Sequence, residues 1–177
     1  MARSHDVSLL VNQRTRSVQN PKLMRASVVS LHASGSSFVK RKEARLILTA
    51  NVGAKGDRHA GRDSARALLI TSAGTYSFLN TKGLSLSYGS LGENIVLQDI
   101  RLHDLPIGSR LQIAETILEL SEPCTVCKSL SEIDHHLPKL LYGKRGIYAR
   151  VLSGGVIAQG DQVVIAKAKT NFASEQL

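Results

Sequence analysis

Apolar and polar residues alternate with the two-residue period of β-strands along much of the chain. The alternation is clear at Arg110–Ala114, where Leu111 and Ile113 fall on one face. Elsewhere short apolar runs are separated by glycine and proline, which is typical of strands joined by turns. We therefore also expect strands at Ala26–Ala33, Ala44–Thr49, Arg66–Thr71, Asn94–Leu97, Ile117–Ser121, Gly146–Leu152 and Asp161–Ala166.

Helical spacing is rarer. Ser72–Asn80 is predicted to be a short helix with Ser72 as its N-cap, and Ser131–Leu141 has apolar residues at helix-compatible positions. We expect Val39–Glu43, with its charged run, to be a solvated stretch, and the chain from Gly154 to Gly160 to turn between the last two strands. The pattern predicts a mainly β (α+β) fold with eight or nine short strands and two or three short helices. It favours a closed or nearly closed β-barrel over a parallel sheet with crossover helices.

The length of 177 residues is typical of one domain. Residues 1–23 lack sustained periodicity, and we interpret them as a basic flexible tail. Residues 24–168 are predicted to form the barrel domain, and residues 169–177 a C-terminal tail. We find no internal repeat and no second domain.

The formal net charge of +9 suggests an anionic partner, with nucleic acid as one class to consider. Residues 1–45, however, hold nine of the 23 Lys and Arg residues and only two of the 14 Asp and Glu residues. The rest of the chain is close to neutral. Basic arms are usually solvated, so the charge does not favour a basic nucleic-acid-binding module as the main function, and we retain it as a third hypothesis.

The sequence contains no apolar run of the roughly 18 residues that a membrane helix needs. Residues 1–20 have no apolar core of the kind that a signal peptide requires. The two cysteines, Cys124 and Cys127, are too few for a disulfide scaffold. These features predict a cytoplasmic protein that does not associate with membranes.

Cys124 follows Pro123 where a strand is expected to end, which places its thiol well for pointing into a cleft. A helix beginning there would lower the pKa of the thiol. The thiol is then a nucleophile, a persulfide carrier or a soft metal ligand, or else Cys124 is a small buried hydrophobic residue. Cys127 completes a Cys-x-x-Cys motif, but no βαβ context favours a redox pair. His135 and His136 have the wrong spacing for a zinc site, so we expect no zinc.

Three further segments carry candidate binding residues. Gly53–Gly61 places Asp57, Arg58 and His59 between glycines that allow a ligand to approach the backbone, and a guanidinium suits phosphate or carboxylate. Leu91–Asn94 ends in Glu93 and Asn94, which are able to hydrogen-bond a heterocycle, and Lys144–Arg150 includes Arg145 and Tyr148. Each segment also has a purely structural interpretation. Gly53–Gly61 would then be a tight turn, Leu91–Asn94 a turn into an edge strand, and Lys144–Arg150 a strand with a polar face.

Taken together, these segments resemble the MOSC domain, which is found at the C-terminus of molybdenum cofactor sulfurases, in its small stand-alone bacterial form. The resemblance covers roughly residues 26–166, and its motifs occur in the order of the family: Gly56–Gly61, Leu91–Ile95, Leu105–Leu111, Glu122–Cys124, Arg145–Val151 and Gly160–Asp161.

The resemblance implies a MOSC-type β-barrel of mostly antiparallel strands that binds the molybdenum cofactor. It implies that Cys124 ligates molybdenum or carries sulfur. By the same resemblance the cofactor-binding residues are Arg58, Glu93, Asn94, Arg145 and Tyr148, and the catalytic residues are Cys124, His59 and Asp57.

Two residues depart from the family pattern, since Arg66 stands where many relatives have Gln and Cys127 is not a general feature. The pyridoxal phosphate-dependent desulfurase domain of the fused sulfurases is missing, so pyridoxal phosphate is not expected in this chain and enters only through the family association. The leading hypothesis is reduction of N-hydroxylated small molecules with a redox partner. The alternative is a sulfur (persulfide) carrier served by a separate cysteine desulfurase. The sequence leaves the substrate and oligomeric state open.

Overall fold

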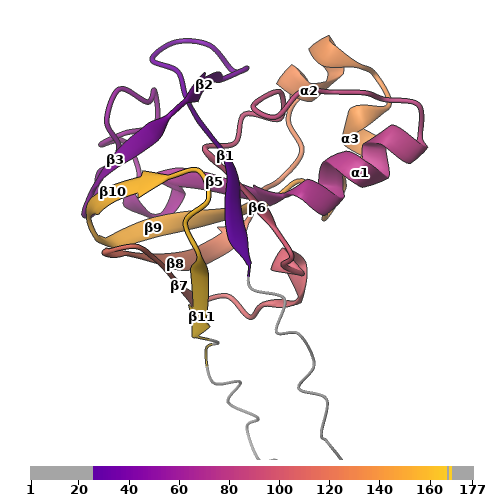
Figure 1. The fold of residues 1–177 in the computed structure, drawn as a ribbon. Helices are drawn as coiled ribbons and strands as arrows, with labels where there is room; N and C mark the ends of the chain where they lie inside the picture. The colour runs from indigo at the N-terminus through magenta and orange to yellow at the C-terminus, as the bar shows by residue number, and fades with distance from the viewer. Residues whose placement is uncertain (1–25, 167, 169–177) are drawn as a thin grey trace, which may run out of the picture.

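Eight strands form one strongly curled sheet in the computed structural model, which describes residues 26–166 and 168 (Figure 1). Its strand order is β11-β7-β8-β9-β5-β6-β1-β2, and a three-stranded sheet, β10-β3-β4, lies beside it. The large sheet contains β1 (Ser27–Ala33), β2 (Arg41–Glu43), β5 (Leu68–Ser72), β6 (Ile95–Gln98), β7 (Arg110–Ile113), β8 (Thr116–Pro123), β9 (Ile147–Ser153) and β11 (Val163–Ala166), and the small sheet β3 (Arg45–Thr49), β4 (Gly53–Ala54) and β10 (Gly155–Ala158).

Backbone hydrogen bonds link opposite ends of this sheet. Val28 N donates to Asp161 O at 2.9 Å, Gly160 N donates to Val28 O at 2.8 Å, and Val163 N donates to Ala26 O at 2.8 Å. The segment that leads into β11 therefore pairs with β1, and the sheet curls back on itself. Among the described strands the β5–β6 pair alone is parallel. The prediction of a barrel-like, mostly antiparallel fold is confirmed.

The alternating residues of the strands fill the inside of the curl. Leu111 and Ile113 of β7 are buried as the sequence pattern predicts, and they face Leu118 and Leu120 of β8 and Val151 of β9 in one cluster. A fully buried aliphatic side chain contributes about 1.5–3 kcal/mol. Burial of this face fixes the register, because a slip of one residue would turn every apolar side chain outward.

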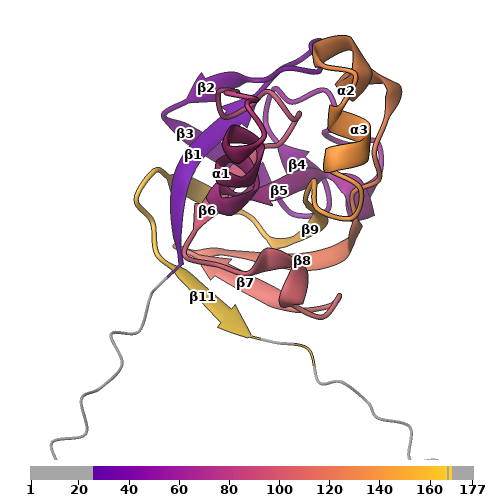
Figure 2. The same ribbon diagram turned by 90° about the vertical axis from the view of Figure 1, so that its right-hand side faces the viewer.

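The helices gather on one side of the curled sheet (Figures 1 and 2). In α1 (Ala73–Thr81) the predicted cap is present, since Ser72 Oγ accepts a hydrogen bond from Thr75 N at 3.3 Å. The single helix predicted at 131–141 is instead two, α2 (Lys128–Ile133) and α3 (Leu137–Leu140). Asp134 is extended, and Pro138 at the start of α3 cannot continue a helix from α2 because it lacks an N–H.

Three short strands were not predicted: β2, β10, and β4 in the glycine-punctuated segment. β2 lies within the charged run expected to be solvated, and β10 lies where a turn was expected. β2 pairs through its backbone with β1 although its side chains are exposed, and Val156 of β10 pairs with Ile47 of β3. Such strands follow from the pairing partner, which local composition does not reveal.

Within the described part of the chain, no helix combines the length and the apolar character needed to cross a membrane. The basic tail predicted at 1–23 and the C-terminal tail predicted at 169–177 lie outside the described residues.

Gly146 stands where β9 passes closest to β5, and a Cβ atom there would overlap the carbonyl oxygen of Ile70. We expect Gly146→Ala to lower the free energy of unfolding by about 1–3 kcal/mol through overpacking. Gly74→Ala in the first turn of α1 is the matched control, because its Cβ has room and alanine favours a helix. Urea unfolding of both variants tests this, and equal stabilities would contradict it.

Candidate functional site

A cleft of about 250 Å³ opens beside the ends of β5 and β9. Loops that are distant in sequence form its walls, because the curled sheet brings the segments 56–61, 89–94 and 124–129 to one edge. Its lining residues are Phe38, Arg58, His59, Arg66, Leu69, Gly92, Asn94, Thr125, Cys127, Ser129, Arg145 and Tyr148.

The cleft is strongly basic. Its described lining includes three arginines, Arg58, Arg66 and Arg145, and no carboxylate. Arg58 has the most donors available, since its guanidinium makes one hydrogen bond among the described residues, from Nη1 to Ser36 O at 3.4 Å. Arg66 is engaged with Glu122, to which Nε and Nη2 donate at 2.7 and 3.0 Å. A small anion is the ligand that this arrangement favours.

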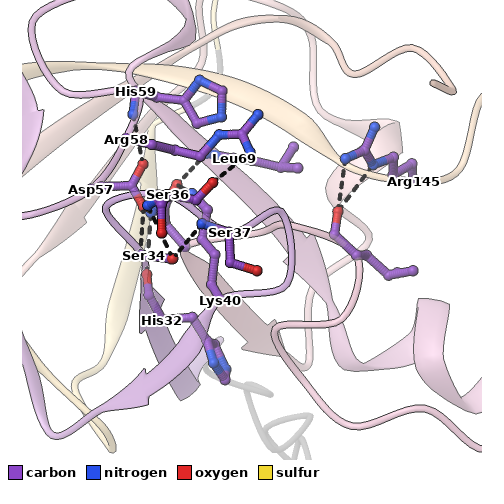
Figure 3. A network of polar contacts seen from close by, with 12 residues as sticks. His32, Ser34, Ser36, Ser37, Lys40, Asp57, Arg58, His59, Leu69 and Arg145 are labelled. Carbon is purple, nitrogen blue, oxygen red and sulfur yellow. Dashed lines mark hydrogen bonds and ion pairs between the residues drawn. The ribbon is translucent and has the colours of Figure 1, made fainter. Parts of the chain in front are cut away.

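Next to Arg58 lies a buried polar network centred on Asp57 (Figure 3). Lys40 Nζ lies 2.8 Å from Asp57 Oδ2, and the same oxygen accepts hydrogen bonds from Asn94 Nδ2 at 3.0 Å and Ser34 N at 3.3 Å. Asp57 Oδ1 accepts from His59 N at 3.0 Å. Both charged side chains of the pair are at most 1% exposed. The expectation that the run at Lys40 is solvated was therefore wrong for this residue.

Asn94 completes the network. Its Oδ1 accepts from Lys40 Nζ at 2.9 Å and from Leu69 N at 3.1 Å, and its Nδ2 donates to His32 O at 3.2 Å as well as to Asp57. The amide thus holds β1, β5 and the loop of Asp57 together. Its hydrogen-bonding capacity is used within the protein.

The charges of the network perturb each other. Burial acts to raise the pKa of Asp57, but the Lys40 ammonium and the hydrogen bonds from Lys40, His59 and Ser34 hold that pKa below its ordinary value. Burial lowers the pKa of Lys40, against the attraction of Asp57. An ionised Asp57 is the state that these contacts favour.

Glu93 lies beneath the cleft wall and is fully buried. Its carboxylate accepts hydrogen bonds from Tyr76 OH at 2.5 Å, Gly89 N at 2.6 Å and Leu91 N at 3.1 Å. Burial raises its pKa. Glu93 therefore shapes the loop that carries Leu91 and Gly92, and it does not line the cleft.

Arg145 connects that loop to the cysteine segment. Its Nε and Nη2 donate to Leu91 O at 3.2 and 2.8 Å, and its Nη1 donates to Thr125 O at 3.0 Å and to Cys127 Sγ at 3.4 Å. The guanidinium also lies over the ring of Phe38, 5.2 Å from its centroid. Arg145 therefore contributes positive charge to the cleft, but most of its hydrogen-bond donors are already bound to groups of the protein itself.

The two cysteines are placed differently. Cys124 is 2% exposed, whereas Cys127 is exposed and lines the cleft. The condition for a lowered pKa at Cys124, a helix beginning there, is not met, because α2 begins at Lys128 with Cys127 as its N-cap. Burial raises the pKa of Cys124, against the charge of Arg145 and a hydrogen bond with Tyr148.

His59 and Tyr148 are half-buried and line the cleft. Burial, followed by the charge of Lys40, lowers the pKa of His59, so the neutral imidazole dominates near neutral pH. Burial and contact with Cys124 raise the pKa of Tyr148. The guanidinium of Arg66 lies 5.7 Å from the Tyr148 ring centroid and covers this end of the cleft.

The model of the MOSC domain family matches residues 55–164, more than half of the chain. The chain belongs to the MOSC domain family. No curated protein matches it.

Solved structures share this MOSC fold. The YuaD protein from Bacillus subtilis superposes with a TM-score of 0.72 at 21% identity, covering 82% of this chain and 98% of its own. YiiM from Geobacillus stearothermophilus gives a TM-score of 0.69 at 20% identity, covering 82% and 77%. YiiM from Escherichia coli gives 0.66 at 20% identity, covering 82% and 71%. At these identities the likeness shows the fold alone.

The eight site residues predicted from the motifs lie at or behind the MOSC cleft. Arg58, His59, Asn94, Arg145 and Tyr148 line it, and Asp57, Glu93 and Cys124 are buried behind its wall. The lining or supporting residues that were not predicted as part of the site include Phe38, Lys40, Arg66 and Cys127. The departure at Arg66 and the Cys-x-x-Cys spacing were usable signals, whereas Phe38 and Lys40 precede the matched segment and carry no motif.

Removing the buried ammonium leaves Asp57 and Asn94 without their cation. We expect Lys40→Met to lower the free energy of unfolding by about 3–5 kcal/mol, because an uncompensated carboxylate remains buried. The double variant Lys40→Met/Asp57→Asn should lose less than the sum of the two single variants. Urea unfolding in a double-mutant cycle measures this coupling, and strict additivity would contradict the ion pair.

The buried ring of His32 should make the stability of the protein depend on pH. Its ring is buried, neither nitrogen has a partner of normal geometry among the described residues, and its pKa falls from 6.5 to about 4, chiefly through burial. Between these values the unfolded chain binds a proton that the folded protein does not, so stability decreases as pH falls. We expect a loss of about 1–2 kcal/mol from pH 7 to pH 5.

Unfolding measured at both pH values in wild type, His32→Phe and the exposed control His103→Gln checks this expectation. The loss should shrink in His32→Phe and persist in His103→Gln. If His32→Phe loses as much stability between the two pH values as wild type, the loss comes from other titratable groups and the expectation is contradicted.

Proposed function

We propose that this MOSC protein binds the molybdenum cofactor in the arginine-lined cleft and uses Cys124 to reduce N-hydroxylated small molecules. The observation that carries the proposal is the cleft itself, because three arginines and the Cys127 thiol line it without a carboxylate in the described lining, and Cys124 is buried behind its wall. Membership of the MOSC family supports the same class of cofactor.

The donor set fits such a group. A pterin phosphate is anionic, and Arg58 offers a planar guanidinium whose donors are largely available. Arg145 adds positive charge at the opposite wall, and Phe38 beside it offers an aromatic face. Thiolate sulfur is a soft ligand of the type that a molybdenum–sulfur centre accepts. In this proposal Arg58 holds the phosphate and Cys124 holds the metal.

When bound, the cofactor would supply two-electron redox chemistry. The protein's residues position it and handle protons. His59 is the proton-transfer residue in this proposal, since its neutral ring faces the cleft. Asp57 holds the backbone of His59, while Asn94 and Glu93 fix the surrounding loops, so these three residues act as positioning residues.

A sulfur carrier remains the second candidate, because the exposed Cys127 places a second thiol at the cleft beside the segment of Cys124. In that role a separate cysteine desulfurase would supply the sulfur, and pyridoxal phosphate would belong to that partner. Both candidates suit a cytoplasmic protein with reduced thiols. A basic nucleic-acid-binding role is the least supported, because one of the cations counted toward it, Lys40, is buried.

The cofactor proposal is tested on full-length protein purified from cells that make the cofactor. We expect molybdenum by elemental analysis and pterin by fluorescence after oxidation. Cys124→Ser should lose molybdenum, and Arg58→Ala should retain about tenfold less pterin, consistent with loss of a charge-assisted contact. Arg62→Ala is the matched control, since this neighbouring arginine is exposed outside the cleft lining.

Wild-type protein with neither metal nor pterin after mild purification would refute the cofactor proposal. Turnover of a hydroxylamine substrate by the loaded protein with a chemical reductant supports the enzyme. For the carrier, a mass gain of about 32 Da after exposure to a cysteine desulfurase, lost in Cys124→Ala, is the expected result.

A further inference from the structure

Two thiols with opposite exposure are separated by only two residues at the wall of the cleft. Cys124 is buried, and Cys127 is exposed to the cleft. The intervening Thr125 and Val126 belong to neither strand nor helix, because β8 ends at Pro123 and α2 begins at Lys128. The stretch between the thiols is therefore the irregular part of an otherwise anchored segment.

Backbone hydrogen bonds anchor the segment at both cysteines. Cys124 N donates to Gly146 O at 2.9 Å, and Cys127 O accepts from Leu130 N at 3.1 Å at the start of α2. Arg145 reaches both thiols, since it donates to Cys127 Sγ and its charge acts on Cys124. A disulfide requires Cα atoms about 4.4–6.8 Å apart, so bridging the two sulfurs requires residues 125–127 to rearrange and Arg145 to release Thr125 O and Cys127 Sγ.

We propose that Cys124 and Cys127 form a reversible dithiol–disulfide couple, in which exposed Cys127 reacts first with a small anionic disulfide and buried Cys124 resolves the product. The order follows from exposure, because a reagent in solution reaches Cys127 before Cys124. The anionic class follows from Arg58, which lines the same cleft and keeps most of its guanidinium donors available.

The exchange balances without a further oxidant. Deprotonated Cys127 attacks one sulfur of the small disulfide, whose S–S bond breaks to release one thiolate and leave a mixed disulfide on Cys127. Cys124 then loses its proton to the solvent and attacks Cys127 Sγ, which expels the second thiolate. The two protein thiols are oxidised, and the small disulfide is reduced to two thiols.

The couple does not depend on the cofactor, but its consequence rests on the proposed function. In the disulfide, Cys124 has no thiolate to offer a metal and cannot carry sulfur. Formation of the disulfide would therefore inactivate the site, and reduction by a cellular thiol would restore the Cys124 thiol.

The experiment exposes reduced full-length protein to glutathione disulfide, followed by acid quenching, intact mass and peptide mapping. We expect wild type to lose about 2 Da and to contain a peptide linked through Cys124 and Cys127. Cys124→Ser should keep one glutathionyl group on Cys127. Cys127→Ser should react at least about tenfold more slowly than wild type, because its remaining thiol is buried.

Circular dichroism of both variants verifies that they are folded, and thermal unfolding shows whether Cys124→Ser has loosened the site. A stable glutathionyl adduct on wild type without the internal disulfide would overturn the proposal. Reaction of folded Cys127→Ser at the wild-type rate would also overturn it. The mass readout needs no molybdenum, so failure of the couple is distinguishable from failure of the cofactor proposal.

Discussion

The buried contact between Lys40 and Asp57 is the interaction on which the site depends. Two charges removed from water are costly, and only close pairing with further hydrogen bonds makes their burial tolerable. Asn94 and the amides of Ser34 and His59 supply those bonds. One ion pair therefore fixes the ends of β1, β5 and the glycine-rich loop relative to each other, and the cleft forms over them.

This arrangement separates structural charges from charges available to a ligand. The inner layer of Lys40, Asp57 and Asn94 is satisfied within the protein. In the outer layer, Arg58 has donors to spare. Arg145 lies between the layers, because it faces the cleft while its donors hold the loops of Leu91 and Thr125. The positive charge that is available to a ligand in the cleft thus belongs mainly to Arg58.

The sequence was sufficient to predict the features governed by local pattern. The alternation at Leu111 and Ile113 identified a strand and its buried face, and Ser72 identified a helix start. Features that depend on distant partners were not predicted. Lys40 stands in a charged run whose other members are exposed, and only the fold brings Asp57 and Asn94 to its ammonium. The break between α2 and α3, in contrast, could have been predicted from Pro138.

The MOSC motif indicates Cys124 as the reactive residue. In the structure, however, the cysteine that lines the cleft is Cys127. A ligand that enters meets the arginines and the Cys127 thiol before it reaches Cys124. Chemistry at Cys124 therefore requires its buried thiol to become exposed, and Arg145 holds the next residue in place through its hydrogen bond to Thr125 O. A ligand that draws Arg145 toward its own negative charge would weaken that restraint. In the proposed function, anion binding and exposure of Cys124 would then be coupled through the guanidinium of Arg145.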